Sequence, residues 1–235
     1  MKKLTLMTLL ASAVLIALIF ANFQMAMAAG TDDVSNTKHN LATIGGGVNV
    51  YGGEICVYCH TPHNSSAMDA PLWNRLPGTA AFTPYNSPSF DSTVITAPTG
   101  VSLACLGCHD GSIGLDIILN QPGTAGDSPV ASGGTTMNNT GNANYNPMLG
   151  GNLSDDHPIS IEYAGTGGSG LDTAFKVLNA VTGLRFFDDA VPGKLSTIQC
   201  ATCHNPHGDS GIGAPEKFLR VANTGSALCV KCHDK

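Results

Sequence analysis

The stretch CVYCHTPH, residues 56–63, contains two cysteines separated by two residues, a histidine directly after the second cysteine, and another histidine three residues later. The first part of this stretch, C-x-x-C-H, occurs four times in the chain of 235 residues, and the four copies use all eight cysteines. The cysteines are Cys56, Cys59, Cys105, Cys108, Cys200, Cys203, Cys229 and Cys232.

The C-x-x-C-H pattern is typical of covalent haem attachment. Two thiols about one helical turn apart lie on one side of the backbone, so each can form a thioether with a haem vinyl group. Disulfides and zinc sites also use paired cysteines, but neither requires a histidine after every second cysteine. We therefore expect four covalent c-type haems whose irons bind the proximal ligands His60, His109, His204 and His233.

Four histidines remain after the proximal ligands are assigned. This number equals the number of distal ligands that four six-coordinate irons require, so we expect bis-histidine ligation throughout. Methionine is the competing distal ligand and would raise the haem potential. No methionine occupies an equivalent place in both halves of the chain, which argues against it. The expected distal ligands are His39, His63, His157 and His207.

The His-x-Pro-His step restricts which iron each distal histidine can reach. The Cα atoms of two axial ligands lie roughly 12 Å apart across a haem, given metal–nitrogen bonds near 2 Å. Three extended residues span at most about 11 Å. His63 therefore serves a haem other than that of His60, most simply the one at His109. By the same argument His207 most simply serves the haem at His233, which leaves His39 and His157 for the haems at His60 and His204.

The two halves of the chain resemble each other, which indicates duplication of a two-haem unit. Each has a free histidine, then C-x-x-C-H-x-P-H, a loop that closes on Arg75 or Arg220, and C-x-x-C-H-D. We expect dihaem repeats at about 39–113 and 157–235, joined by a Gly/Asn/Thr-rich loop region within one domain, 29–235. The two arginines are candidates to pair with haem propionates.

Composition predicts a mostly irregular fold with short helices and a few short strands, organised around four covalent haems. Glycine numbers 28 and proline 13, and aromatic residues make up only 6%. Such a chain needs cohesion from staples, metals or cofactors. Strand signals occur near 159–163 and 184–187, and a short helix signal at 173–180.

The N-terminus is expected to be a secretory signal peptide, residues 1–28, that is cleaved after Ala28. It has two lysines, an apolar stretch and a small-x-small end. The formal net charge is −6, and loss of Lys2 and Lys3 lowers it to about −8, which argues against a nucleic-acid partner. No segment after Ala28 is apolar enough to span a membrane.

The arrangement resembles the doubled C-x-x-C-H motif of multihaem cytochromes, and more specifically the tetrahaem extracellular cytochromes of the OmcE type. The likeness lies in HNLA at His39, CVYCHTPH, PLWNR, LACLGCHDGS, DHPIS at His157, CATCHNPH and LCVKCHD. The resemblance implies bis-histidine ligation, polymerisation into conductive filaments, and one haem completed by a histidine of a neighbouring subunit.

The expected function is therefore electron transfer without catalysis, in a secreted protein at the extracellular or cell-surface side. We expect a head-to-tail homopolymer that passes electrons to other redox proteins or extracellular acceptors. A soluble periplasmic shuttle is the first alternative, but compact shuttles use fewer residues per haem. A multihaem reductase is the second, but it would need an open iron position.

His39 is the favoured distal ligand for the contact between subunits, because it lies only about ten residues after the expected cleavage site. A terminal segment is ordered only if something ties it down, and a neighbouring haem would do so. The alternative is that His39 folds back onto the haem at His60 of its own chain. His157 and His207 are the other candidates for this contact.

Haem content provides the first test. Mass spectrometry of the purified protein should find four covalent haems on a chain that starts near Ala29. A free thiol or a disulfide at any of the eight cysteines would contradict the attachment scheme.

Overall fold

The structure is a computed structural model that describes residues 34–43, 51, 53–90, 92, 95–122, 136–137, 147–163, 174–188, 196–208 and 218–234. The expected signal peptide, 1–28, lies outside the described residues, as does most of the loop between the repeats. Among the described residues, no helix is long and apolar enough to cross a membrane.

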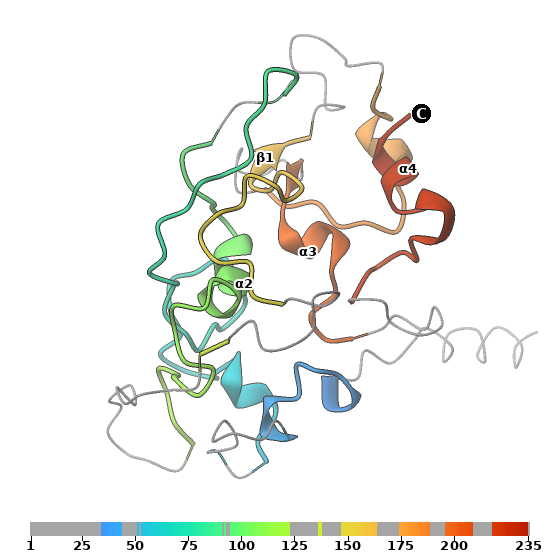
Figure 1. Ribbon diagram of the computed structural model, residues 1–235. Coiled ribbons are helices and arrows are strands. Elements are labelled where there is room, and N and C mark those ends of the chain that lie inside the picture. The colour runs from blue at the N-terminus through green and yellow to red at the C-terminus, as the bar shows by residue number, and fades with distance from the viewer. Residues whose placement is uncertain are drawn as a thin grey trace, which may run out of the picture.

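The described chain is mostly irregular, as the composition predicted, and its helices are short (Figure 1). Each of the four C-x-x-C-H motifs forms or ends a helical turn. These turns are the 3-10 helix η3 (Cys56–Tyr58), α2 (Ser102–His109), α3 (Cys200–Cys203) and α4 (Cys229–Cys232). Four further 3-10 helices are η1 (Val34–Asn36), η2 (Leu41–Thr43), η5 (Leu178–Ala180) and η6 (Thr224–Ser226).

Two strands form the single described sheet. β1 (Ile161–Glu162) pairs antiparallel with β2 (Thr197–Ile198), and Ile161 lies opposite Ile198. β1 falls inside the expected strand at 159–163. The expected strand at 184–187 is reduced to one bridge, between Phe187 and Thr197. The expected helix at 173–180 is reduced to η5, and residue 173 lies outside the described residues.

The apolar core is divided into two small clusters. One surrounds Tyr58 and combines the N-terminal segment with the chain after α2, through Leu41, Tyr51, Leu115 and Ile118. The other surrounds Tyr163 and lies beside β1 and β2, with Phe175, Phe186 and Cys232 packed against it. Neither cluster is large, which agrees with a fold that depends on something other than aliphatic packing.

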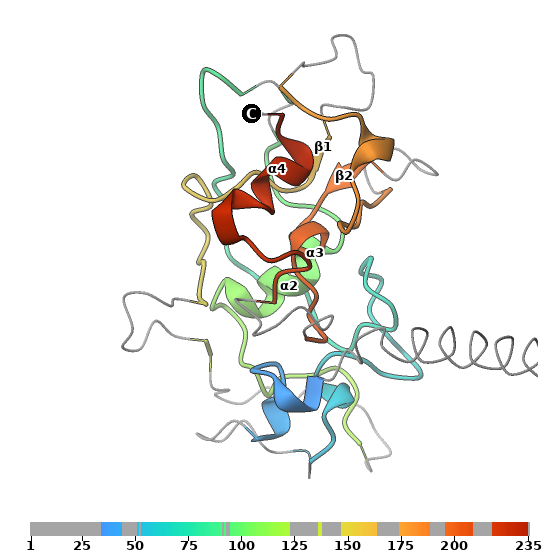
Figure 2. The ribbon, with the colours of Figure 1, turned by 90° about the vertical axis from the view of Figure 1, so that its right-hand side faces the viewer.

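The four attachment segments lie in a row. In two perpendicular views, η3 lies next to α2, α3 follows, and α4 lies on the far side of α3 (Figures 1 and 2). Direct contacts join α2 to α3. Because α2 belongs to the first repeat and α3 to the second, the two repeats meet in the middle of the row.

The backbone after each C-x-x-C-H-x-P-H segment follows the same course in both repeats. His60 forms an antiparallel bridge with Trp73, and His204 forms one with Leu219. The N–H of Asn74 donates to the Cys59 carbonyl at 2.8 Å, and the N–H of Arg220 to the Cys203 carbonyl at 2.7 Å. Arg220 is therefore the structural equivalent of Asn74. The sequence comparison had matched Arg220 with Arg75, the residue after Asn74.

The side chains at these equivalent positions also have the same role. The Asn74 amide donates to the Val57 carbonyl at 2.8 Å. The Arg220 Nε donates to the Ala201 carbonyl at 2.9 Å. Val57 and Ala201 each follow the first cysteine of a motif. In both repeats, one side chain of the closing loop thus supports the turn that carries the two thiols.

Arg75 is a separate structural element of the first repeat. Its side chain is 1% exposed, and its guanidinium donates to the carbonyl oxygens of Tyr58, Gly114 and Leu115. Charged donors to buried carbonyls form some of the stronger hydrogen bonds in proteins. Arg75 therefore joins the first attachment turn to the chain that follows α2.

We predict that Arg75→Met destabilises the protein far more than Arg220→Met. Without Arg75 the Tyr58 and Leu115 carbonyls lose this donor, whereas the Gly114 carbonyl still accepts from the Ile117 N–H. Each buried carbonyl left without a donor costs about 1–3 kcal/mol, so the first variant should lose at least about 2 kcal/mol of unfolding free energy. The half-buried Arg220 donates by Nε to the Ala201 carbonyl, and loss of that hydrogen bond should cost about 1 kcal/mol. Denaturant titrations followed by circular dichroism would measure both. Equal midpoints would contradict the role assigned to Arg75.

Candidate haem-binding site

No two of the eight cysteines form a disulfide with each other. In each motif the helical turn brings the following histidine back over the first cysteine. The His60 N–H donates to the Cys56 carbonyl at 2.8 Å, and the His233 N–H to the Cys229 carbonyl at 3.0 Å. This turn places the two thiols and the histidine of a motif on one side of the backbone.

Thiols of successive motifs are neighbours at the first junction of the row. Burial raises the pKa of the Cys59 thiol to about 12, and the Cys108 thiol adds to this rise. Cys59 and Cys108 also pack against the same apolar cluster around Tyr58, so the first and second motifs are adjacent.

The second and third junctions have the same character. The Cys105 and Cys200 side chains share a hydrogen bond, which together with burial raises the pKa of Cys105 well above its usual value. Burial raises the pKa of Cys203 to about 11, and Cys232 is the first neighbour to add to it. The two views show the four motifs in the same order in space as in the sequence (Figures 1 and 2).

Six of the eight histidines face one another in three pairs. The ring centres of His39 and His109 lie 6.2 Å apart. Those of His60 and His207 lie 6.0 Å apart, and those of His157 and His233 lie 6.5 Å apart. Each pair consists of one proximal histidine and one expected distal histidine from a distant part of the chain.

The pair distances agree with two imidazoles on opposite sides of one iron. Two metal–nitrogen bonds near 2 Å, with about 1 Å from each bonded nitrogen to its ring centre, put the centres about 6 Å apart. Within the described residues, no three His, Cys, Asp or Glu side chains converge as ligands of a directly bound metal ion. The residues therefore fit haem, which needs two protein ligands per iron.

Proline carbonyls orient four of the imidazoles. Nδ1 donates to a proline carbonyl in His39 (2.7 Å), His60 (2.7 Å), His109 (2.6 Å) and His157 (2.9 Å). The acceptor is Pro206 for His39, Pro71 for His60, Pro147 for His109 and Pro158 for His157. A carbonyl accepts only, so Nδ1 carries the proton and the Nε2 lone pair is left for iron.

The environment of His39 also favours the neutral imidazole. Burial lowers the pKa of His39 below its usual 6.5, while its hydrogen bond to the Pro206 carbonyl opposes this shift. Positive charge on the nearby His109, His207 and His204 would lower the pKa further. Because a metal binds the neutral form of histidine, this environment prepares His39 to act as a ligand.

Unsatisfied polar atoms collect in the loop after His60. Trp73 Nε1, Arg75 Nε and Ser66 Oγ are buried and have no hydrogen-bond partner among the described residues. The Trp73 ring lies 5.7 Å from that of His60. Buried donors are normally paired, so their position fits an acceptor such as a haem propionate. The other nitrogens of the Arg75 guanidinium already donate to carbonyls, so Nε is the atom that could donate to the propionate expected from the sequence.

The structure differs from the sequence in which distal histidine faces which proximal one. His39 lies beside His109 of its own chain, where His63 was expected. His207 lies beside His60, not His233. The span of three residues excludes only the haem of the proximal histidine that lies three residues before His63 or His207. It does not distinguish among the three other haems. The tertiary contacts between repeats make that choice.

His63 is the distal candidate that the structure leaves apart. Its side chain is exposed, and among the described residues it makes no ring contact. Of the methionines, Met137 packs against the cluster around Tyr58, and Met148 lies close to Gly111.

A polar residue that the sequence analysis missed connects the two repeats. Gln199 precedes the third motif and is 1% exposed. Its Oε1 accepts hydrogen bonds from the N–H and hydroxyl of Ser102 in α2 and from the Ser160 hydroxyl. The Ser102 hydroxyl in turn accepts from the Cys200 N–H at 3.0 Å. This buried network fixes α2 against α3 beside the thiols of Cys105 and Cys200.

Comparison with known families identifies the C-terminal part of the chain. Residues 194–235 match the doubled CXXCH motif family, and this segment holds the third and fourth motifs. The match supports a multihaem c-type cytochrome that takes part in electron transfer, and it points to an electron carrier rather than an enzyme. It indicates covalently bound c-type haem, while the number of four stays a prediction. No curated protein sequence matches the chain.

The observed pairing predicts the haem that loses a ligand in His207→Ala. The haem held by His60 should open, and in the reduced protein carbon monoxide should bind there. Trp73 is the only tryptophan of the chain, so NMR contacts between its ring and the modified haem would identify the site. A modified haem without contact to Trp73 would support the sequence-based assignment of His207 to the haem at His233.

Proposed function

We propose that this protein is a secreted tetrahaem electron carrier, and that its copies assemble head to tail into an extracellular filament that conducts electrons to external acceptors. The supporting observation is the row of four attachment sites with neighbouring thiols at all three junctions. Haem supplies a one-electron Fe(III)/Fe(II) couple when it is bound. The chain's contribution is to hold four such groups in sequence, each beside the next.

Ligation by two histidines per iron supports transfer over catalysis. In three of the four sites, a second imidazole faces the proximal histidine. A reductase would need an open position for its substrate, and each such pair closes one position. Two imidazoles without methionine also favour a low potential, which suits an electron donor to external acceptors.

Both ends of the row are accessible. Cys56 in the first motif and Cys229 in the fourth are exposed. Apolar side chains are exposed near each end, with Leu76 50% exposed beside the first repeat's closing loop and Val230 38% exposed inside the fourth motif. Head-to-tail contacts between the two ends of the row would build an open filament.

His63 is the candidate for a ligand shared between copies. It cannot reach the haem held by His60, three residues before it. His109 and His233 already face His39 and His157. The haem held by His204 is therefore the assignment that remains for His63. Because the His63 side chain is exposed, we propose that it completes this haem in a neighbouring copy.

The soluble periplasmic shuttle is the second candidate function. It needs the same four haems and the same row, so the observations within one chain support it equally. What favours the filament is the exposed His63 and the low content of charged residues, 12%, since charged faces disfavour permanent interfaces.

Electron microscopy of two matched variants tests the filament. His63→Ala and His39→Ala should each open one iron and add one high-spin haem, measured by electron paramagnetic resonance. Only His63→Ala should abolish filaments in negative-stain images, because His39 binds within its own chain.

Two results would count against the proposal. Filaments that survive His63→Ala would exclude His63 as the shared ligand. A wild-type protein that stays monomeric under native conditions, with four low-spin haems, would favour the soluble shuttle.

A further inference from the structure

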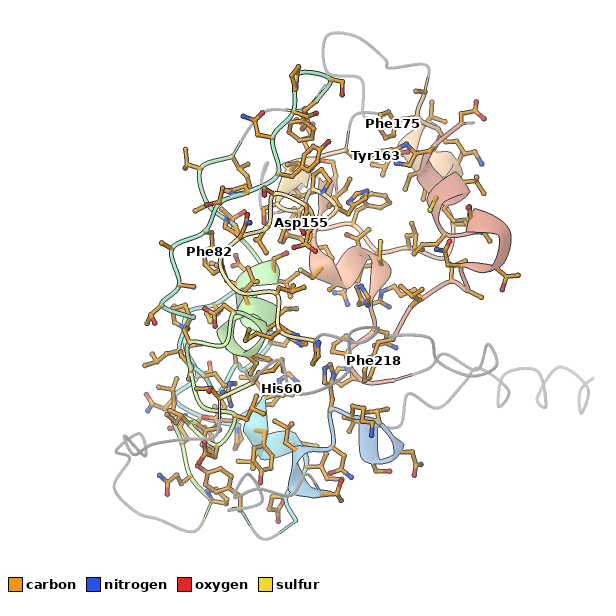
Figure 3. All side chains as sticks on the ribbon, in the orientation of Figure 1. His60, Phe82, Asp155, Tyr163, Phe175 and Phe218 are labelled. Carbon is orange, nitrogen blue, oxygen red and sulfur yellow. The ribbon has the colours of Figure 1, made fainter. Side chains whose placement is uncertain are left out.

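Two groups from the second repeat hold the imidazole of His39. Its Nδ1 donates to the Pro206 carbonyl at 2.7 Å. Its ring stacks on Phe218, with ring centres 4.3 Å apart and planes inclined by 16°. Phe218 and His60 are both labelled in Figure 3. The His109 ring also lies beside the His39 ring, and their centres are 6.2 Å apart.

The two contacts restrict different motions of the His39 ring. The hydrogen bond fixes the direction of the Nδ1–H bond. It leaves the ring free to rotate about that bond, because a carbonyl oxygen accepts over a broad range of directions. A ring stacked nearly parallel on the imidazole removes this rotation. Phe218 therefore determines the plane of His39, and Pro206 determines its direction.

Phe218 is set in place by the backbone of its own repeat. Its carbonyl accepts from the Asn205 N–H at 2.8 Å, so it lies directly beside Pro206. Its φ is 61°, in the left-handed region that costs energy for a residue other than glycine. The turn thus brings a large ring next to the proline carbonyl that receives His39.

Leu72 is the equivalent residue of the first repeat. It has the same left-handed backbone, with a φ of 50°, and its carbonyl accepts from the Thr61 N–H at 2.9 Å. Its side chain is aliphatic and 54% exposed. The turn itself is therefore common to both repeats. The aromatic ring is specific to the second repeat, where a histidine from elsewhere in the chain is bound.

We propose that Phe218 is a positioning residue that fixes the imidazole plane of His39 opposite His109. This inference rests on the proposed function, because it takes His39 as an axial ligand. The orientation of an axial imidazole plane governs the splitting of the iron d orbitals and so the g values of a low-spin haem. Loss of an aromatic stack also weakens retention of the ligand, by about threefold to tenfold.

The test compares Phe218→Ala with Leu72→Ala and Phe218→Tyr in the haem-loaded protein. Alanine keeps Cβ, so both alanine variants retain the same left-handed backbone. In Phe218→Ala, the largest g value of one low-spin signal should shift. Cyanide should also displace one distal ligand about threefold to tenfold more readily. Leu72→Ala should match the wild type, and Phe218→Tyr, which keeps the ring, should restore its signals.

Each result decides between the claims when His39→Ala is measured beside these variants. If Phe218→Ala matches the wild type in g values and cyanide affinity while His39→Ala opens one iron, the positioning role is wrong and the ligation stands. If Leu72→Ala causes the same shift as Phe218→Ala, the effect belongs to the turn and the role is also wrong. If His39→Ala leaves every haem low-spin, the proposed ligation itself fails.

Discussion

The proposed axial ligation requires two imidazoles on one line through an iron, and the facing histidine pairs of the structure meet this directional constraint. Neighbouring residues cannot supply both ligands, because the chain between them would have to pass around the haem. Each observed pair therefore joins distant segments: His39 with His109, His60 with His207, and His157 with His233. The second repeat contributes to two of these pairs. It supplies His207 to one, and Pro206 and Phe218 contact His39 in another. The fold needs little regular structure because these long-range links replace it.

Backbone carbonyls make this constraint compatible with an irregular chain. A histidine ligand must present Nε2 with its lone pair free, and a hydrogen bond from Nδ1 enforces that tautomer. Proline is suited to provide the acceptor, since its fixed φ makes the position of its carbonyl reproducible within a loop. Pro71, Pro147, Pro158 and Pro206 do this in four separate loops. The high proline content of the chain thus has a specific use at the ligand sites.

The two repeats share a backbone course but differ in the roles of their side chains. Both close their loops with the same hydrogen bonds to the cysteine turn and with the same left-handed residue. Their side chains differ where the repeats meet other parts of the chain. Phe218 stacks on His39, whereas Leu72 is exposed. Arg75 is buried under the first turn, and Gln199 joins α2 to α3 beside Cys105 and Cys200. The local turn is common to both repeats, and the contacts between repeats are made by side chains that differ between them.

The sequence by itself determined the irregular character of the fold, and it predicts the cofactor attachment sites and the proximal ligands, because these depend on composition and local spacing. Thiols one helical turn apart and an adjacent histidine need no tertiary information. Even the exclusion of His63 from the haem of His60 is local, since it depends only on the reach of three residues. Tertiary structure decided the rest. It placed His39 against His109 and His207 against His60, and it matched Arg220 with Asn74 instead of Arg75. These choices depend on which distant segments pack together, and spacing along the chain carries no record of that packing.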